Sequence, residues 1–191
     1  MPTYRVLIVD DNEGIHDDFR TLLQPDRSPD ELDALAEELF GDQARAPAHE
    51  DVPQYHFDSV FQGPSALASV ENAVANGEAY ALAFVDIRMP PGWDGVETIL
   101  KLWAVDPDLQ IVLCSAYSDY SWEEIVQKLG VSDKLLMLRK PFDPDSVKQL
   151  ALTTTCRWER DRRIRQRMAE LEAELEECRR QLSDARPERA D

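Results

Sequence analysis

The sequence predicts an α/β fold, a doubly wound sheet of five parallel strands with helices on both faces. Short apolar runs alternate with segments of helical period, which is typical of βα units around a parallel sheet. Most of the runs are almost entirely apolar, as expected for strands covered on both faces. The chain is 43% hydrophobic and 31% charged, so it can form a core beneath a well-solvated surface.

The expected elements follow one another along the chain. The apolar runs predict strands at Arg5–Val9, Tyr55–Val60, Ala81–Val85, Gln110–Cys114 and Lys134–Leu138. The segments between them predict helices at Gly14–Leu23, Ser65–Ala75, Gly95–Ala104 and Trp122–Leu129, and a last helix opening near Pro144. Sheets of this kind bind ligands beyond the carboxyl ends of their strands, where the strand order reverses.

An insertion at residues 24–54 separates the first helix from the second strand and is longer than most loops. In its first half, Ser28–Phe40, leucines recur at helical spacing with acidic residues between them. We therefore expect an inserted amphipathic helix there. The second half, Gly41–Pro53, is polar and predicts a mobile loop.

The composition changes near residue 158, which predicts an α/β domain over 1–157, a coiled-coil helix over 158–185 and a disordered tail over 186–191. Apolar side chains there recur at steps of four and three residues: Ile164, Met168, Leu171, Leu175, Cys178 and Leu182. This heptad pattern favours a parallel homodimer. A solitary solvated helix is the alternative, because about three heptads bury little apolar surface.

The formal charge of -17 argues against a nucleic-acid partner, because an acidic surface repels a polyanion. No apolar run is long enough for membrane insertion, and the first ten residues lack the layout of a signal peptide. We expect a cytoplasmic protein. Its three cysteines lie far apart without CxxC spacing, which favours reduced thiols over a disulfide or zinc framework.

Polar side chains stand where four of the predicted strands end. Asp10 and Asp11 follow the first strand, Asp86 the third, Ser115 the fourth, and Lys140 comes soon after the fifth. Because parallel strands end at one edge of the sheet, these side chains should meet there. Taken singly, each is more often a cap or an ordinary loop residue, and only their combination is specific.

Three carboxylates packed together repel one another, and a hard divalent cation relieves the repulsion. Mg²⁺ fits best, held by Asp11 and Asp86 while Asp10 places a water. This arrangement makes Asp86 a nucleophile toward an incoming phosphoryl group. Lys140 would then pair with the transferred phosphate, and Ser115 would donate a hydrogen bond to it.

Four segments resemble the receiver domains of two-component response regulators. They are VLIVDDN (Val6–Asn12), FVDIRMPPGWDG (Phe84–Gly95), LCSAYSD (Leu113–Asp119) and LRKPF (Leu138–Phe142). The resemblance implies a flavodoxin-like fold and Mg²⁺-dependent transfer of phosphate to the acceptor aspartate. The donor would be a phosphohistidine of a sensor histidine kinase or a histidine phosphotransfer protein.

Residue by residue, the resemblance makes Asp86 the phosphoacceptor. It implies that Asp10 and Asp11 are the acidic pair, that Ser115 is the switch hydroxyl, and that Lys140 is the lysine before a cis-prone proline. The backbone carbonyl of Arg88, two residues after the acceptor, would complete the metal shell.

This chain departs from the family's pattern in three ways. The loop MPPGWDG after Asp86 is one residue longer than the common form, and Met137 stands where the family usually has a switch aromatic. The insertion at 24–54 is similar to that of receivers that precede kinase, diguanylate cyclase or phosphodiesterase modules.

Two other functions are open to the same residues. Phosphohydrolases that use an aspartate nucleophile usually have a second Asp two residues later, where this chain has Arg88. An inert receiver-like adaptor would act through the coiled coil alone. In an active receiver, the segment Ala116–Ser121 would carry the signal, with Tyr117, Tyr120 and Trp122 as candidate contacts for a downstream effector.

Overall fold

The structure is a computed structural model that describes residues 2–24, 53–116 and 120–184. The helix expected at Ser28–Phe40, nearly all of the loop that follows it, and the tail at 186–191 lie outside these residues. Tyr117 also lies outside them.

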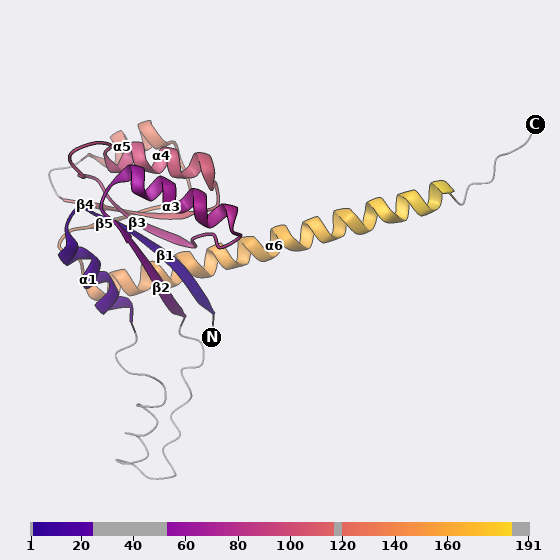
Figure 1. The fold of residues 1–191 in the computed structure, drawn as a ribbon, viewed down its shortest axis with the longest axis horizontal. Coiled ribbons are helices and arrows are strands. Elements are labelled where there is room, and N and C mark those ends of the chain that lie inside the picture. Colours follow the sequence, from indigo (N-terminus) through magenta and orange to yellow (C-terminus); the bar gives the residue numbers. More distant parts are fainter. Residues whose placement is uncertain (1, 25–52, 117–119, 185–191) are drawn as a thin grey trace, which may run out of the picture. The chain divides into compact units, whose positions relative to one another are not determined.

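Five parallel strands form one sheet in the order β2-β1-β3-β4-β5. The strands are β1 (Thr3–Val9), β2 (Gln54–Val60), β3 (Leu82–Asp86), β4 (Gln110–Ser115) and β5 (Leu135–Arg139). This arrangement confirms the predicted doubly wound parallel sheet (Figure 1). The strand order reverses between β1 and β3, so a crevice for a ligand is expected at the carboxyl ends of these two strands.

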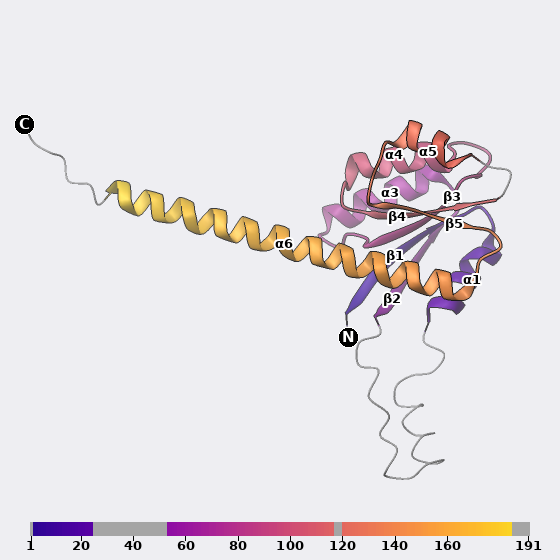
Figure 2. The same cartoon turned by 180° about the vertical axis from the view of Figure 1, so that it is seen from behind.

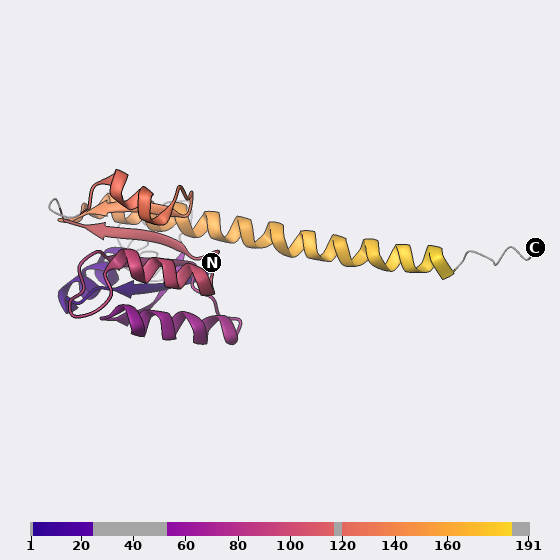
Figure 3. The same ribbon diagram turned by 90° about the horizontal axis from the view of Figure 1, so that it is seen from above.

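Helices cover both faces of the sheet. They are α1 (Glu13–Leu23), α3 (Gly63–Ala75), α4 (Gly95–Val105), α5 (Trp122–Leu129) and α6 (Pro144–Asp184). Helices α3, α4 and α5 lie on one face of the sheet, and α1 and the start of α6 lie on the other (Figures 2 and 3). The side chains of each group pack in a separate core against the sheet. The sheet thus lies between two helical layers, with its strand ends open at the edges.

Side-chain caps fix the starts of the helices that follow the site loops. Asn12 Oδ1 accepts a hydrogen bond from the Gly14 N–H at α1, at 3.0 Å, and Asp94 Oδ1 accepts one from the Glu97 N–H at α4, at 2.8 Å. Each cap satisfies one of the backbone donors that a helix leaves free at its first turn. The loops after β1 and β3 are therefore anchored at both ends.

The contacts divide the chain into two compact units, residues 1–155 and 156–191. Helix α6 crosses from the first unit into the second, which confirms a long C-terminal helix. Among the residues that the structure describes, no helix combines the length and the apolar character needed to span a bilayer.

The side chain of Phe84 in β3 supports the strand that carries Asp86. Its ring stacks on that of Phe19 in α1 with the centroids 4.2 Å apart, and both rings are almost fully buried. We expect Phe84→Ala to lower the free energy of unfolding by about 3–5 kcal/mol, because it leaves a cavity in a close-packed layer. Urea denaturation followed by circular dichroism measures this loss.

The matched control is Val131→Ala, since Val131 is 92% exposed. We expect it to change stability by no more than about 0.5 kcal/mol. Equal effects of the two substitutions would contradict this assignment of the core.

Candidate functional site

Lys140 joins the ends of β1 and β3. Its Nζ lies 2.7 Å from Asp10 Oδ2 and 2.7 Å from Asp86 Oδ1. The side chains of Asp10 and Asp86 are only 3% and 9% exposed, and that of Lys140 is 26% exposed. Burying two carboxylates together is costly, and the ammonium group between them offsets part of that cost.

Backbone N–H groups hold the remaining oxygens of the two buried carboxylates. The Asn12 N–H donates to Asp10 Oδ1 at 2.9 Å, and the Arg88 N–H donates to Asp86 Oδ2 at 2.8 Å. Each of the four oxygens thus accepts one hydrogen bond or ion pair, and each keeps a further lone pair. The carboxylates are fixed in orientation and still able to bind another electrophile or cation.

Asp11 completes an acidic cluster with Asp10 and Asp86. One oxygen from each of the three lies within 4.8 Å of the others. Two oxygens that bind one Mg²⁺ at about 2.1 Å lie at most about 4.2 Å apart, so small side-chain movements bring this cluster into range. Asp11 is exposed while its two neighbours are buried, so an ion can enter from its side. The donor set therefore fits a hard divalent cation.

Burial and the ion pairs act oppositely on the titration of the site. Burial is the largest influence on Asp86 and raises the pKa of its carboxyl above the ordinary value, although Lys140 opposes this shift. Burial would lower the pKa of Lys140, but its hydrogen bonds to Asp10 and Asp86 outweigh this effect and raise the pKa. Lys140 therefore stays protonated beside Asp86 and stabilises the ionised form of that carboxyl group.

Ser115 is the last residue of β4 and is 2% exposed. Its carbonyl accepts a hydrogen bond from the Lys140 N–H at 2.8 Å, so the two residues are joined through the backbone. Arg88 is exposed and lies in the loop after β3. The structure brings Asp10, Asp11 and Asp86 together with Lys140; the roles predicted for Ser115 and for the Arg88 carbonyl stay predictions.

Gly95 allows α4 to start against the acceptor strand. A Cβ atom at this position would lie 2.2 Å from the carbonyl oxygen of Asp86 and 2.9 Å from the Cα of Ile87. The Gly95 N–H donates to the Ile87 carbonyl at 2.9 Å, which closes the loop between them. Only glycine permits this approach without displacing the backbone of Asp86.

A buried histidine missing from the sequence analysis holds the backbone of Asp10. His16 in α1 is 1% exposed, and its Nε2 lies 2.8 Å from the Asp10 carbonyl oxygen. Its Nδ1 lies 2.9 Å from Ser59 Oγ, which also accepts a hydrogen bond from Arg20 at 2.7 Å. Because a carbonyl only accepts, His16 Nε2 donates the hydrogen bond to Asp10. The sequence held one sign of this role, since His16 shares the inward face of α1 with Phe19 and Leu23.

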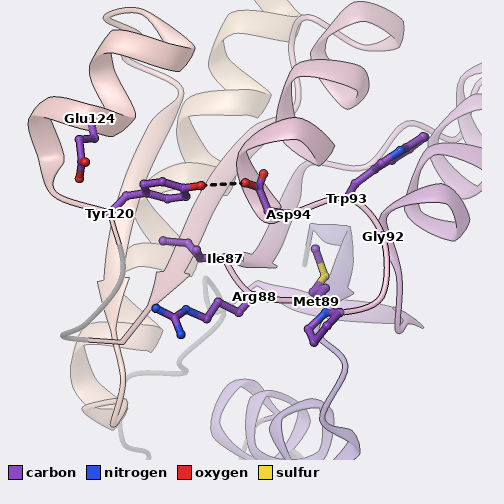
Figure 4. A pocket seen from close by; sticks show the side chains of 9 residues that line it. Ile87, Arg88, Met89, Gly92, Trp93, Asp94, Tyr120 and Glu124 are labelled. Carbon is purple, nitrogen blue, oxygen red and sulfur yellow. Dashed lines mark hydrogen bonds between the residues drawn. The ribbon is translucent and has the colours of Figure 1, made fainter.

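A hollow of about 570 Å³ lies beside the acceptor loop. Its lining comes from the loop after β3 and from the start of α5: Ile87, Arg88, Met89, Pro90, Gly92, Trp93, Asp94, Tyr120 and Glu124. Across it the Tyr120 hydroxyl donates to Asp94 Oδ2 at 3.1 Å (Figure 4). The same Asp94 caps α4, so Tyr120 ties the segment after β4 to the helix after the acceptor loop.

Comparisons with known proteins agree with the fold of the α/β unit. A receiver domain protein (CheY-like) from Methanospirillum hungatei JF-1 superposes with a TM-score of 0.57 over 83% of this chain and 98% of that one, at 19% identity. The fold is that of a receiver domain. No protein-family model matches the chain.

Two curated relatives from Bacillus subtilis (strain 168) also support a receiver domain. Sporulation initiation phosphotransferase F is 25% identical over 88 residues, which are 46% of this chain and 66% of that protein. The uncharacterized transcriptional regulatory protein YesN is 30% identical over 97 residues, which are 46% of this chain and 25% of that protein. The chain therefore spans just under two thirds of the first relative and a quarter of the second.

The hydrogen bonds that join His16, Ser59 and Arg20 stabilise the α/β unit. Ser59→Ala leaves His16 Nδ1 without its hydrogen-bond partner and removes an acceptor from Arg20, so we expect a loss of about 1–2 kcal/mol in the free energy of unfolding. Chemical denaturation measures this loss. Ser69→Ala, which removes a half-buried serine hydroxyl from α3, is the control and should cost less than about 0.5 kcal/mol. A similar cost for both substitutions would argue against this stabilising role.

Proposed function

We propose that this receiver accepts a phosphoryl group on Asp86 in a two-component phosphorelay. The observation that carries the proposal is the contact of Lys140 Nζ with both Asp86 and Asp10, in an acidic cluster at the carboxyl ends of the strands. A structural ion pair alone does not need a cluster of three carboxylates, two of them in contact with one ammonium group. A phosphoryl acceptor does, since nucleophile, cation and phosphate must share one small site.

In the proposed reaction an oxygen of the Asp86 carboxylate bonds to phosphorus while the P–N bond of a phosphohistidine breaks. The imidazole nitrogen of the donor keeps the bonding electrons and takes up a proton. Asp86 needs no general base, because an ionised carboxylate is already a nucleophile. The Lys140 ammonium group then forms an ion pair with the new phosphate in place of the carboxylates, and the Ser115 hydroxyl donates a hydrogen bond to a phosphate oxygen.

Mg²⁺ is the cation that the acidic cluster would hold. Asp11 and Asp86 would bind it directly, Asp10 would orient a water on it, and the Arg88 carbonyl would complete its shell. When bound, the ion neutralises charge on the phosphoryl oxygens. The three carboxylates and Lys140 carry a formal charge of about -2 before it binds, which favours its entry.

The partners follow from this chemistry. We propose a sensor histidine kinase or a histidine phosphotransfer protein as donor, in the cytoplasm, and a downstream effector that reads the segment between β4 and α5. Drawing Ser115 toward a phosphate would pull on this segment and strain the hydrogen bond between Tyr120 and Asp94. The second unit would contribute through a homodimer of α6.

Labelling tests the acceptor. We expect acetyl phosphate with Mg²⁺ to add one phosphoryl group to the protein, detected by intact mass, and Asp86→Asn to abolish it because an amide is a poor nucleophile. Asp18→Asn, an exposed acid on α1, is the control and should leave labelling unchanged. Absence of labelling in the unmodified chain would favour the inert adaptor, and turnover of a small phosphate ester would favour a phosphohydrolase.

Thermal unfolding tests the cation site. At Mg²⁺ concentrations tenfold above the dissociation constant, binding to the folded state adds about 1.4 kcal/mol. We expect a rise in Tm of about 3–6 °C that EDTA reverses. Asp11→Asn should reduce the rise and Asp18→Asn should not. An equal rise with NaCl at matched ionic strength would show general screening rather than a site.

A further inference from the structure

Helix α6 carries an exposed apolar stripe in the second unit. Ile164, Met168, Leu171 and Leu175 are 51%, 55%, 43% and 58% exposed, and the exposed Cys178 continues the line. We call these five residues the α6 seam. We propose that a second copy of this chain covers the seam in parallel orientation and in register, from Ile164 to Gln181. The inference rests on the proposed homodimer, whose parallel direction the heptad pattern already favours, and adds its register and the side chains that set both.

The spacing of the seam fixes the heptad positions. Steps of four and three residues place Ile164, Leu171 and Cys178 at the d position, and Met168 and Leu175 at the a position. The charged side chains beside the seam then fall at the flanking positions. Arg160, Arg167, Glu174 and Gln181 are at g, and Arg165, Glu172 and Arg179 are at e.

Parallel pairing brings opposite charges together. A residue at g meets the e residue five positions later in the second copy, so Arg167 meets Glu172 and Glu174 meets Arg179. Two-fold symmetry repeats each pair, which gives four attractive contacts. Every seam residue also meets its own counterpart, so the apolar layers match along the whole stripe.

Charge disfavours the antiparallel register that is centred on Ala173. In antiparallel pairing, g residues meet g residues and e residues meet e residues. Glu172 then meets Glu172 of the second copy, Glu174 meets Glu174, and Arg165 meets Arg179. All three contacts bring like charges together, so this register loses the attraction that the parallel arrangement gains.

A second antiparallel register, centred between Ala169 and Glu170, has favourable charges but a poor core. It pairs Arg167 with Glu174 of the second copy, and likewise Arg165 with Glu172. It also places Cys178 against Asp161, which would bury a carboxylate that now pairs with Arg160. Burying a charge beside an apolar layer is costly, so the parallel arrangement is favoured.

Two like-charged contacts just before the seam oppose the parallel arrangement, and in one of them Asp161, at the a position, would meet its own counterpart. Arg160 at g would meet Arg165 of the second copy, just before the seam begins. The Arg160 side chain is 65% exposed and is paired with Asp161, so solvent and this neighbour weaken the repulsion. The repulsion therefore sets where pairing starts, at Ile164, and does not cancel the four attractive contacts.

A charge swap on the full chain tests the direction, with the association constant measured by sedimentation equilibrium. Arg167→Glu should weaken association about tenfold, since two attractive contacts become repulsive. Adding Glu172→Arg should restore it to within about threefold if the helices are parallel. In the second antiparallel register the double variant faces Glu174 and Arg165 with like charges, so association would weaken further.

Arg163→Glu is the matched control. Arg163 pairs with Glu159 within its own helix at 2.8 Å and lies away from the seam, so its reversal removes a similar intrahelical pair. We expect association to stay within about threefold of the unmodified chain. An effect as large as that of Arg167→Glu would show that helix stability, and not pairing, was measured, and would overturn the proposal.

Cys178 reports the register. In a Cys156→Ser variant, mild oxidation with diamide, which takes up the two thiol hydrogens, should link Cys178 to Cys178 of the second copy. A monomer at all concentrations, a mass of three copies, or a dimer without this link would overturn the inference. Labelling of Asp86 in the same samples is independent of all three results, so failure here is distinguishable from failure of the phosphoacceptor proposal.

Discussion

The two ion pairs of Lys140 are the constraint on which the candidate site depends. They connect segments that are far apart in the chain, since Asp10 follows β1, Asp86 ends β3 and Lys140 follows β5. Without the ammonium group, two buried carboxylates would face each other in a poorly solvated crevice. The same contact therefore stabilises the sheet edge and keeps the proposed nucleophile in place.

Two residues behind the acidic cluster, His16 and Gly95, fix the backbone of Asp10 and Asp86. His16 holds the carbonyl of Asp10, and the absence of a side chain at Gly95 lets α4 approach the carbonyl of Asp86. Both residues act on backbone carbonyl groups rather than on the carboxylates of the acidic cluster. The backbone positions of Asp10 and Asp86 thus depend on His16 and Gly95, whereas the charge beside their carboxylates comes from Lys140.

Much of the fold and the acidic cluster followed from the sequence, because apolar runs mark buried strands and polar residues mark their ends. The predicted strands at Ala81–Val85, Gln110–Cys114 and Lys134–Leu138 each stopped one residue early. The backbone pairing continues through Asp86, Ser115 and Arg139. Because these side chains are polar, a prediction based on runs of apolar residues ends each strand one residue before them. The link from His16 to Ser59 was missed because it depends on how α1 packs against β2.

The limited length of the α6 seam bears on the output proposed for the second unit. Five apolar or thiol side chains would bury little surface, so the free energy of the proposed pairing would be small. An association equilibrium near balance responds most to a small added free energy, whereas a long coiled coil would stay paired whatever changed at the acidic cluster. A short seam whose direction is set by a few charges therefore suits regulated association better than permanent assembly.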